Sequence, residues 1–147
     1  MDSAVRGVEQ AERVELLALW EASVRATHDF LSEADIAALR PQIMNEYFDL
    51  VELRCLCGTQ GEILAFMGTA GERLEMLFVH PEHRGQGLGG RLARHAMGAL
   101  GVREVDVNEQ NPQALGFYLR LGFEVAGRSA LDGQGRPFPL LHLRLPS

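Results

Sequence analysis

The chain has 147 residues, of which 46% are hydrophobic and 23% are charged, and it carries a formal net charge of -6. These values are typical of an ordinary soluble domain with its own core, and the acidic balance argues against broad nucleic-acid binding. No apolar run approaches the roughly 20 residues that a membrane span needs, and residues 1–6 do not resemble a signal peptide. We therefore expect one cytoplasmic domain over residues 1–147, with no nucleic-acid or membrane partner.

The first third of the chain is predicted to be helical. Apolar residues recur at helical spacing from about Glu9 to Ala26. Ser32, with Asp35 three residues further on, is a candidate N-cap for a second helical segment, which Pro41 either kinks or splits into a pair. Both segments are expected to pack on a sheet.

Between residues 51 and 79 the pattern changes to short apolar runs separated by turns. The runs cover Val51–Leu56, Glu62–Thr69 and Arg73–Val79, which predicts an antiparallel three-stranded meander. Cys55 and Cys57 alternate in the first run. Two cysteines supply no disulfide framework, so we expect reduced, packed thiols.

The second half of the chain alternates between helical and strand patterns. A helix is predicted over residues 88–100 and a strand over Glu104–Val107. The order of strand, glycine turn, helix and strand favours parallel pairing through a right-handed crossover. A further helix over Pro112–Leu121 and two strands over Phe123–Arg128 and Leu140–Leu145 complete the chain.

The most informative segment is the glycine-rich turn of residues 84–91, which follows an apolar strand and opens a helix. Glycines let the backbone approach an anion closely, and the first N–H groups of the helix supply donors with a partial positive charge. Arg84 and Arg91 add full charges beside them. The sequence therefore predicts a site for a phosphate-bearing ligand.

Residues 85–90 also satisfy the dinucleotide pattern G-x-G-x-x-G, and Asp106 lies near the usual ribose-binding offset. Against that alternative, residues 80–84 separate the strand from the first glycine, and only one strand-helix-strand unit follows. A P-loop is not indicated, because no Lys-Ser or Lys-Thr pair follows the glycines. His80 and His83 are spaced like metal ligands, but without further clustered ligands we expect no metal.

A resemblance to a known family rests on two motifs. Arg84–Gly89 resembles the R-G-x-G-x-G/A signature of the GNAT superfamily, the acetyl-CoA-dependent N-acetyltransferases, and Leu77–Pro81 is similar to that family's fourth strand and its exit. Asn111, followed by Tyr118 and then by Gly122-Phe123, resembles its second motif. Residues 27–31, 108–111 and 137–141 resemble the small bacterial YjaB-type branch, which extends the similarity over most of the chain.

This resemblance implies an α/β fold with a twisted mixed sheet of about seven strands, flanked by about four helices and splayed between the fourth and fifth strands. It also implies an N-acetyltransferase that moves an acetyl group from acetyl-CoA to a primary amine by direct attack in a ternary complex. The acceptor is either a small-molecule amine or a protein or peptide amine. A different class stays open, an acyl-CoA-binding sensor or interaction module without turnover. Family members often form dimers, so a homodimer is one expected assembly.

For the cofactor, the resemblance assigns the pyrophosphate of coenzyme A to the main chain of the glycine turn. The residues concerned are Arg84, Gly85, Gln86, Gly87, Leu88 and Gly89, with Gly90 and Arg91 as neighbours. The pantetheine arm is expected to pair like an added strand along Leu77, Phe78 and Val79 and to contact Asn111. The N–H of either Leu77 or Phe78 would polarise the thioester carbonyl.

The resemblance also suggests catalytic roles. A free alkylamine has a pKa near 10.4 and must lose a proton before it attacks. Glu75 is the first candidate base, and a plain surface carboxylate is the alternative. Tyr118 lies where the family places the acid for the departing thiolate, and a buried structural tyrosine is the alternative. Trp20, Thr27, His28 and Phe30 are expected to wall the acceptor pocket. The alternatives are a core position for Trp20, since a tryptophan on an amphipathic helix is more often core, and a satisfied structural histidine for His28.

Overall fold

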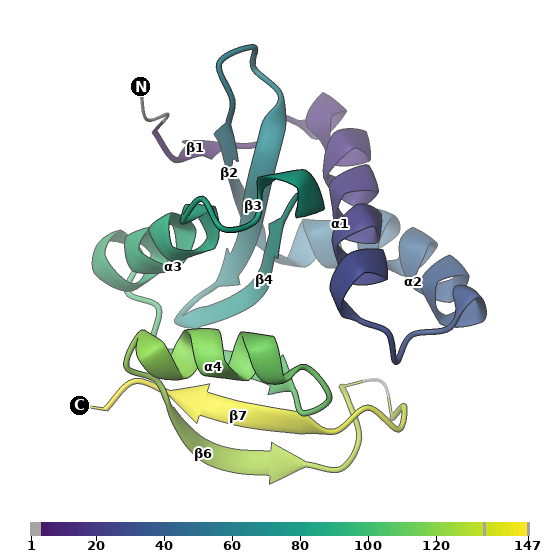
Figure 1. Cartoon of the computed structure of the whole chain (residues 1–147), viewed down its shortest axis with the longest axis vertical. Coiled ribbons are helices and arrows are strands. Elements are labelled where there is room, and N and C mark those ends of the chain that lie inside the picture. The colour runs from purple at the N-terminus through teal and green to yellow at the C-terminus, as the bar shows by residue number, and fades with distance from the viewer. Residues whose placement is uncertain (1–3, 134, 147) are drawn as a thin grey trace.

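A seven-stranded mixed sheet carries two α-helices on each face in the computed structural model, which describes residues 4–133 and 135–146 (Figure 1). The strand order is β1-β2-β3-β4-β5-β7-β6. This architecture confirms the expected fold. The strands are β1 (Arg6–Gly7), β2 (Glu52–Cys57), β3 (Ile63–Ala70), β4 (Arg73–Val79), β5 (Glu104–Asn108), β6 (Glu124–Ser129) and β7 (Leu140–Arg144).

Helices α1 (Arg13–Thr27) and α2 (Glu33–Asn45) cover one face of the sheet. Ser32 caps α2 as predicted: its Oγ accepts the Asp35 N–H at 3.0 Å, and Asp35 Oδ2 accepts the Ser32 N–H at 2.9 Å. Pro41 neither splits nor ends α2. The carbonyl that loses its helical partner is that of Ala37, and both residues are exposed, so water can satisfy it.

Helices α3 (Leu88–Ala99) and α4 (Pro112–Arg120) cover the other face. The sheet therefore separates two apolar cores, and the side chains of β4 alternate between them. Leu77 and Val79 pack toward α3 and α4, whereas Met76 and Phe78 pack toward α1 and α2. Short 3-10 turns at Gln10–Glu12, Tyr47–Leu50 and Pro81–His83 connect these elements.

The predicted meander is present as β2, β3 and β4, and the two-residue strand β1 extends it at the outer edge of β2. Cys55 is buried and Cys57 is half-buried, and both are free thiols. Within the described part of the chain, no helix is long and apolar enough to cross a membrane.

Strands β4 and β5 run parallel as predicted, but they pair only at Arg73 with Glu104 and at Leu74 with Val105. Beyond these two pairs the strands separate, which is the expected splay. A β-bulge lies at the same point, because Met76 pairs with Gly68 and Leu74 pairs with Thr69, which leaves Glu75 without a partner on β3. The sheet is therefore open on one edge of β4 from Glu75 onward.

Candidate active site

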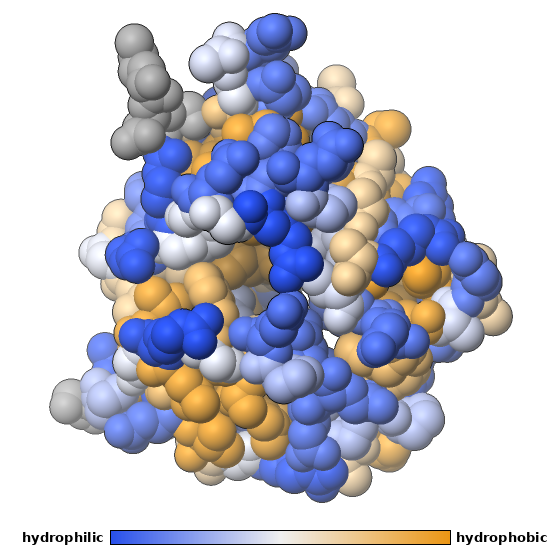
Figure 2. All heavy atoms as spheres, viewed as in Figure 1, coloured by the Kyte–Doolittle hydropathy of each residue, from blue (hydrophilic) through white to orange (hydrophobic). Residues whose placement is uncertain are grey.

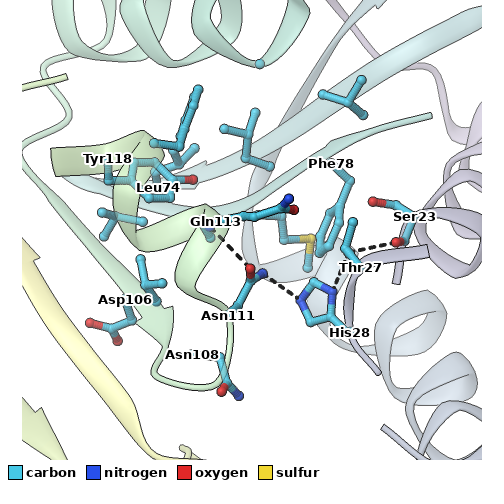
Figure 3. Close-up of a pocket in the computed structure, with 18 of the residues that line it drawn as sticks. Ser23, Thr27, His28, Leu74, Phe78, Asp106, Asn108, Asn111, Gln113 and Tyr118 are labelled. Carbon is cyan, nitrogen blue, oxygen red and sulfur yellow. Dashed lines mark hydrogen bonds between the residues drawn. The ribbon is translucent and has the colours of Figure 1, made fainter. Parts of the chain in front are cut away.

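The splay opens a cleft of about 300 Å³ between β4, β5, the end of α1 and the start of α4. Figure 2 shows a hollow on this face of the molecule, rimmed by hydrophilic side chains and floored by apolar ones. Figure 3 shows the residues inside it. The lining residues used below are Thr27, His28, Glu75, Leu77, Phe78, Val79, Arg84, Asp106, Asn111, Gln113 and Tyr118.

The free edge of β4 forms one wall of this cleft. His80 donates its N–H to the Leu64 carbonyl on β3 at 2.8 Å. Backbone N–H groups alternate between the two edges of a strand, so the Phe78 N–H points to β3, whereas the N–H groups of Leu77 and Val79 point to the free edge. The edge therefore offers unpaired donors to a ligand in the cleft.

The glycine turn lines an adjoining cavity of about 520 Å³, which α4 closes on the opposite side. Gly85 and Gly87 have φ values of +82° and +78°, which favour glycine because other residues rarely adopt them. Gly87 is the N-cap of α3 and supplies no side-chain cap, so the first N–H groups of α3 are available to an anion. The side chain of Arg84 ties the turn to α4, since its Nη2 donates to Gln113 Oε1 at 2.9 Å.

The cavity at the turn is lined by most, but not all, of the residues expected there. Arg84, Gly85, Gly87, Leu88, Gly89 and Gly90 line it. Gln86 is exposed, and Arg91 is half-buried in the first turn of α3, but neither lines this cavity or the cleft. The turn thus combines a backbone anion site with one guanidinium that is held in place by α4.

Tyr118 is buried on α4, and its ring packs edge-on between Phe117 and Phe123, at centroid distances of 4.9 and 5.7 Å. It also lines the cleft, with its hydroxyl group pointing into it (Figure 3). Burial raises the pKa of the Tyr118 phenol far above its ordinary value of 10. The hydroxyl is therefore protonated at every physiological pH and can act as a hydrogen-bond donor.

Glu75 lies at the bulge and lines both the cleft and a further groove of about 570 Å³. Its Oε1 accepts a hydrogen bond from Arg73 Nε at 2.9 Å. The same guanidinium lies 3.6 Å from Glu104 Oε2 and contacts Asp106. The Glu75 carboxylate is thus already engaged by a cation at the point where the two hollows meet.

That further groove has mostly apolar walls and two acidic side chains. Its residues come from α2, the following 3-10 turn, β3, β4 and the loop before β7: Leu39, Tyr47, Leu50, Val51, Ala70, Glu75, Met76, Asp132 and Gly133. Because Glu75 lines both hollows, the groove approaches the cleft from the far side of β4.

Of the four residues expected to wall the acceptor pocket, Thr27 and His28 line the cleft. Trp20 does not: it is 5% exposed and belongs to the core between α1, α2 and the sheet. Phe30 lies behind the wall, with its ring 5.2 Å from that of His28 and 6.0 Å from that of Phe138. The amphipathic pattern of α1 explains the position of Trp20, since its indole ring lies on the apolar face.

Asn111 joins α4 to the cleft in two ways. Its Oδ1 accepts the Ala114 N–H at 3.2 Å, which caps α4 as the sequence suggested. Its Nδ2 lies 3.5 Å from His28 Nε2 (Figure 3). Asn111 therefore presents its amide group between the helix start and the end of α1.

A polar cluster that the sequence did not reveal lies on β5, β6 and β7. Asp106 Oδ1 is 2.7 Å from His142 Nδ1, and His142 Nε2 is 2.6 Å from Ser129 Oγ. The spacing of these residues along the sequence does not predict their contact, because they become neighbours only when β7 pairs between β5 and β6. Asp106 contacts Arg73 and His142, and among the described strands only β4 and β5 run parallel, a topology that does not fit the dinucleotide-binding alternative.

No group of three or more metal-binding side chains occurs within residues 4–133 and 135–146. His80 Nδ1 instead accepts the Glu82 N–H at 3.2 Å, and its ring packs against that of His83. The contacts of these two histidines therefore lie within the short turn that follows β4.

Comparison with known proteins agrees with this geometry. Residues 52–125 match the family described as Acetyltransferase (GNAT) domain. The chain is 42% identical over 142 residues to the peptidyl-lysine N-acetyltransferase YjaB of Salmonella typhimurium, covering 97% of each chain. The solution structure of apo-form YjaB from Escherichia coli superposes with a TM-score of 0.88 at 37% identity, covering 98% of this chain and 97% of that one. A PaiA N-acetyltransferase from Thermoplasma acidophilum, solved with coenzyme A, shares the fold at 18% identity, with a TM-score of 0.75 and coverage of 99% and 100%.

The chain therefore belongs to the GNAT superfamily of N-acetyltransferases. It is an acetyltransferase, and its similarity to YjaB extends over nearly the whole sequence and the whole fold.

Proposed function

We propose that this enzyme transfers the acetyl group of acetyl-CoA to the side-chain amine of a lysine in a protein or peptide, by direct attack in a ternary complex. The observation that carries the proposal is the position of the free β4 edge, which lies between the glycine turn and the groove of about 570 Å³ at Glu75. We assign this groove to the acceptor and call it the acceptor groove. A donor bound along this edge would meet an acceptor arriving from the other side. Peptidyl-lysine is the acceptor named for the relative from Salmonella typhimurium.

The donor half of the site fits coenzyme A. The N–H groups at the start of α3, with Arg84 beside them, suit the pyrophosphate, and the alternating donors of β4 suit the amide groups of the pantetheine arm. The N–H of Leu77 is the donor we assign to the thioester oxygen, because the Phe78 N–H is directed to β3. Asn111 is expected to contact the same arm.

The acceptor half of the site fits a lysine side chain. The apolar walls of the acceptor groove match a flexible four-carbon stem. Arg73 is shared among Glu75, Glu104 and Asp106, so the negative charge around Glu75 exceeds that of the one cation and favours an ammonium group. Glu75 then marks the passage from the groove to the cleft.

Tyr118 is suited to the departure of coenzyme A. Because its phenol stays protonated, it can donate a hydrogen bond to the sulfur as the thiolate forms. Full proton transfer from so weak an acid is unfavourable, so hydrogen-bond stabilisation of the thiolate is the role we assign to it.

The test uses the full-length protein with acetyl-CoA and lysine-containing peptides. Calorimetry measures binding, and mass spectrometry detects the acetylated peptide. We expect Arg84→Ala to weaken acetyl-CoA binding, whereas Arg94→Ala, an exposed arginine outside the cleft and the turn cavity, leaves it unchanged. If the enzyme acetylated small amines but no peptide, the proposed peptide acceptor would be wrong. If it bound acetyl-CoA tightly but acetylated no amine, the sensor alternative would be favoured.

A further inference from the structure

His28, at the end of α1, is held by hydrogen bonds on both sides of its ring (Figure 3). Its backbone N–H donates to the Val24 carbonyl at 2.7 Å, which fixes the main chain. On the side chain, Nδ1 lies 2.7 Å from Thr27 Oγ1, and Nε2 lies 3.5 Å from Asn111 Nδ2. These contacts fix the main chain and the imidazole ring of His28, which lines the cleft.

These contacts determine which ring nitrogen carries the proton. Thr27 Oγ1 donates its only proton to the Ser23 carbonyl at 2.8 Å, so it can only accept from His28. A neutral His28 therefore carries its hydrogen on Nδ1, so Nε2 is the nitrogen that accepts hydrogen bonds. Asn111 points its Nδ2 to this nitrogen because its Oδ1 already accepts the Ala114 N–H.

The surroundings of His28 favour the neutral form. Burial lowers the pKa of its imidazole below the ordinary 6.5, and the neighbouring Asp29 opposes this shift only in part. The other charged side chains of the cleft are Glu75 on β4, Arg84 and Asp106 on β5. Phe30, Phe78 and Asn111 bring no charge to the ring.

We propose that Nε2 of His28 accepts the proton that the attacking amine loses. The inference rests on the proposed function, because it needs an amine at the thioester. Nε2 faces a cleft that Met76, Phe78 and the free β4 edge also line, and a single long contact to Asn111 occupies it. Glu75, the alternative base, already accepts a hydrogen bond from Arg73.

The lysine ammonium first loses one proton to water, and the step then starts from the neutral amine. The amine nitrogen forms a bond to the thioester carbon while the carbonyl electron pair moves to oxygen, which leaves an extra proton on nitrogen. Nε2 takes this proton and His28 becomes an imidazolium, whose Nδ1–H still donates to Thr27. The electron pair on oxygen then re-forms the carbonyl of the amide product, and the carbon–sulfur bond breaks with its electron pair on sulfur. The thiolate takes a proton from water, and the imidazolium returns one to water.

Thr27 acts as a positioning residue in this scheme, because its hydroxyl group selects the Nδ1–H tautomer. Thr27→Val removes the acceptor for that hydrogen and allows the other tautomer, which has no lone pair on Nε2. Thr27→Ser keeps the hydroxyl. The two substitutions therefore separate the hydrogen bond from the packing of the side chain.

The experiment follows kcat and kcat/KM for a lysine peptide against pH in the wild-type enzyme, His28→Gln, His28→Ala, Thr27→Val and Thr27→Ser. We expect His28→Gln to lower kcat roughly 100-fold and to remove the low-pH limb of the profile that belongs to the imidazole. Added imidazole should partly restore His28→Ala, and Thr27→Ser should exceed Thr27→Val. His95→Gln on α3, a histidine outside the cleft, is the matched control and should keep the wild-type profile.

The outcomes separate the two proposals. An unchanged profile in His28→Gln, with the wild-type enzyme active on the peptide, would overturn the role of His28 and leave the proposed function intact. A wild-type protein that binds acetyl-CoA but acetylates no amine would overturn the proposed function, and the role of His28 with it. Calorimetry with acetyl-CoA confirms that each variant is folded.

Discussion

Arg73 on β4 contacts Asp106 on β5, next to the two residue pairs, Arg73 with Glu104 and Leu74 with Val105, that join these strands. The Arg73 guanidinium also reaches Glu75 and Glu104, so one cation holds three carboxylates at the base of the cleft. The cluster joins the two strands where backbone pairing ends. It therefore closes the sheet at the base of the cleft.

Replacing this cation should destabilise the protein in a salt-dependent way. Arg73→Leu leaves the three carboxylates to repel one another, and we expect a loss of about 1–2 kcal/mol at low ionic strength that shrinks in 1 M salt. Arg54→Leu breaks one ion pair with the exposed Glu52 and one long hydrogen bond, 3.5 Å, to Thr69 Oγ1, and its loss should be smaller and should depend less on salt. Denaturant unfolding of both variants at two salt concentrations checks the prediction. Equal losses for the two variants would contradict a shared role for Arg73.

The left-handed backbone of Gly87 should be needed for both folding and binding. Gly87→Ala forces a Cβ into the φ value of +78°, which costs about 1–2 kcal/mol, and any rearrangement displaces the first N–H groups of α3. Gly98, also on α3 and with open space around it, has no positive φ, so Gly98→Ala should stabilise the helix by roughly 0.5–1 kcal/mol. Thermal unfolding and acetyl-CoA calorimetry together check the pair. Full affinity in Gly87→Ala would exclude the proposed pyrophosphate site.

Removing the Tyr118 hydroxyl should slow the reaction without unfolding the protein. Its ring keeps its contacts with Phe117 and Phe123 in Tyr118→Phe, and no hydrogen bond to another described residue is lost. We expect kcat to fall roughly 10-fold or more, with a nearly unchanged KM for acetyl-CoA. Because burial raises the pKa of this phenol, the wild-type profile should show no loss of activity from tyrosine ionisation up to about pH 10. Steady-state kinetics at varied pH measures both effects.

His28 should make the folded protein less stable in mild acid. Its pKa is lower in the folded state than the unfolded value of 6.5, so the unfolded chain binds the extra proton first. The free energy of unfolding should therefore decrease as the pH falls below about 6.5, toward the lower folded pKa. In His28→Gln this contribution disappears, and the melting temperature between pH 6.5 and 5 should change less. A steeper decrease in the variant would contradict the assigned direction.

Much of the fold follows from local sequence signals, as the bounds of β4 and the cap of α2 illustrate. Residues 73–79 are an apolar run between turns, and Ser32 with Asp35 forms a self-contained capping box. Strand β1 was missed because two exposed residues have no pattern of their own and depend on their pairing with β2. Pro41 was ambiguous because its cost depends on whether the Ala37 carbonyl reaches water.

The candidate site also contains some features that the sequence predicts and others that only the fold reveals. The glycine turn is contiguous in sequence, so its chemistry can be predicted from the residues themselves. The bulge at Glu75, the tie between His28 and Asn111, and the Asp106–His142–Ser129 cluster join segments that are distant along the chain. The burial of Trp20 depends on which face of α1 packs against the sheet. The helical spacing of apolar residues in α1 is compatible with this burial but does not by itself distinguish it from a position in the pocket wall. Such relationships require the three-dimensional fold.

The unpaired edge of β4 has a consequence for the stability of the protein in solution. A bare strand edge is a template for strands of other chains, and here it is shielded only by its short length and its position between two layers. A ligand that pairs with this edge completes the sheet and binds the native state alone. The melting temperature should therefore rise with the logarithm of the acetyl-CoA concentration, and resistance to aggregation should rise with it. The concentration of acetyl-CoA then affects the lifetime of the folded enzyme as well as its rate of turnover.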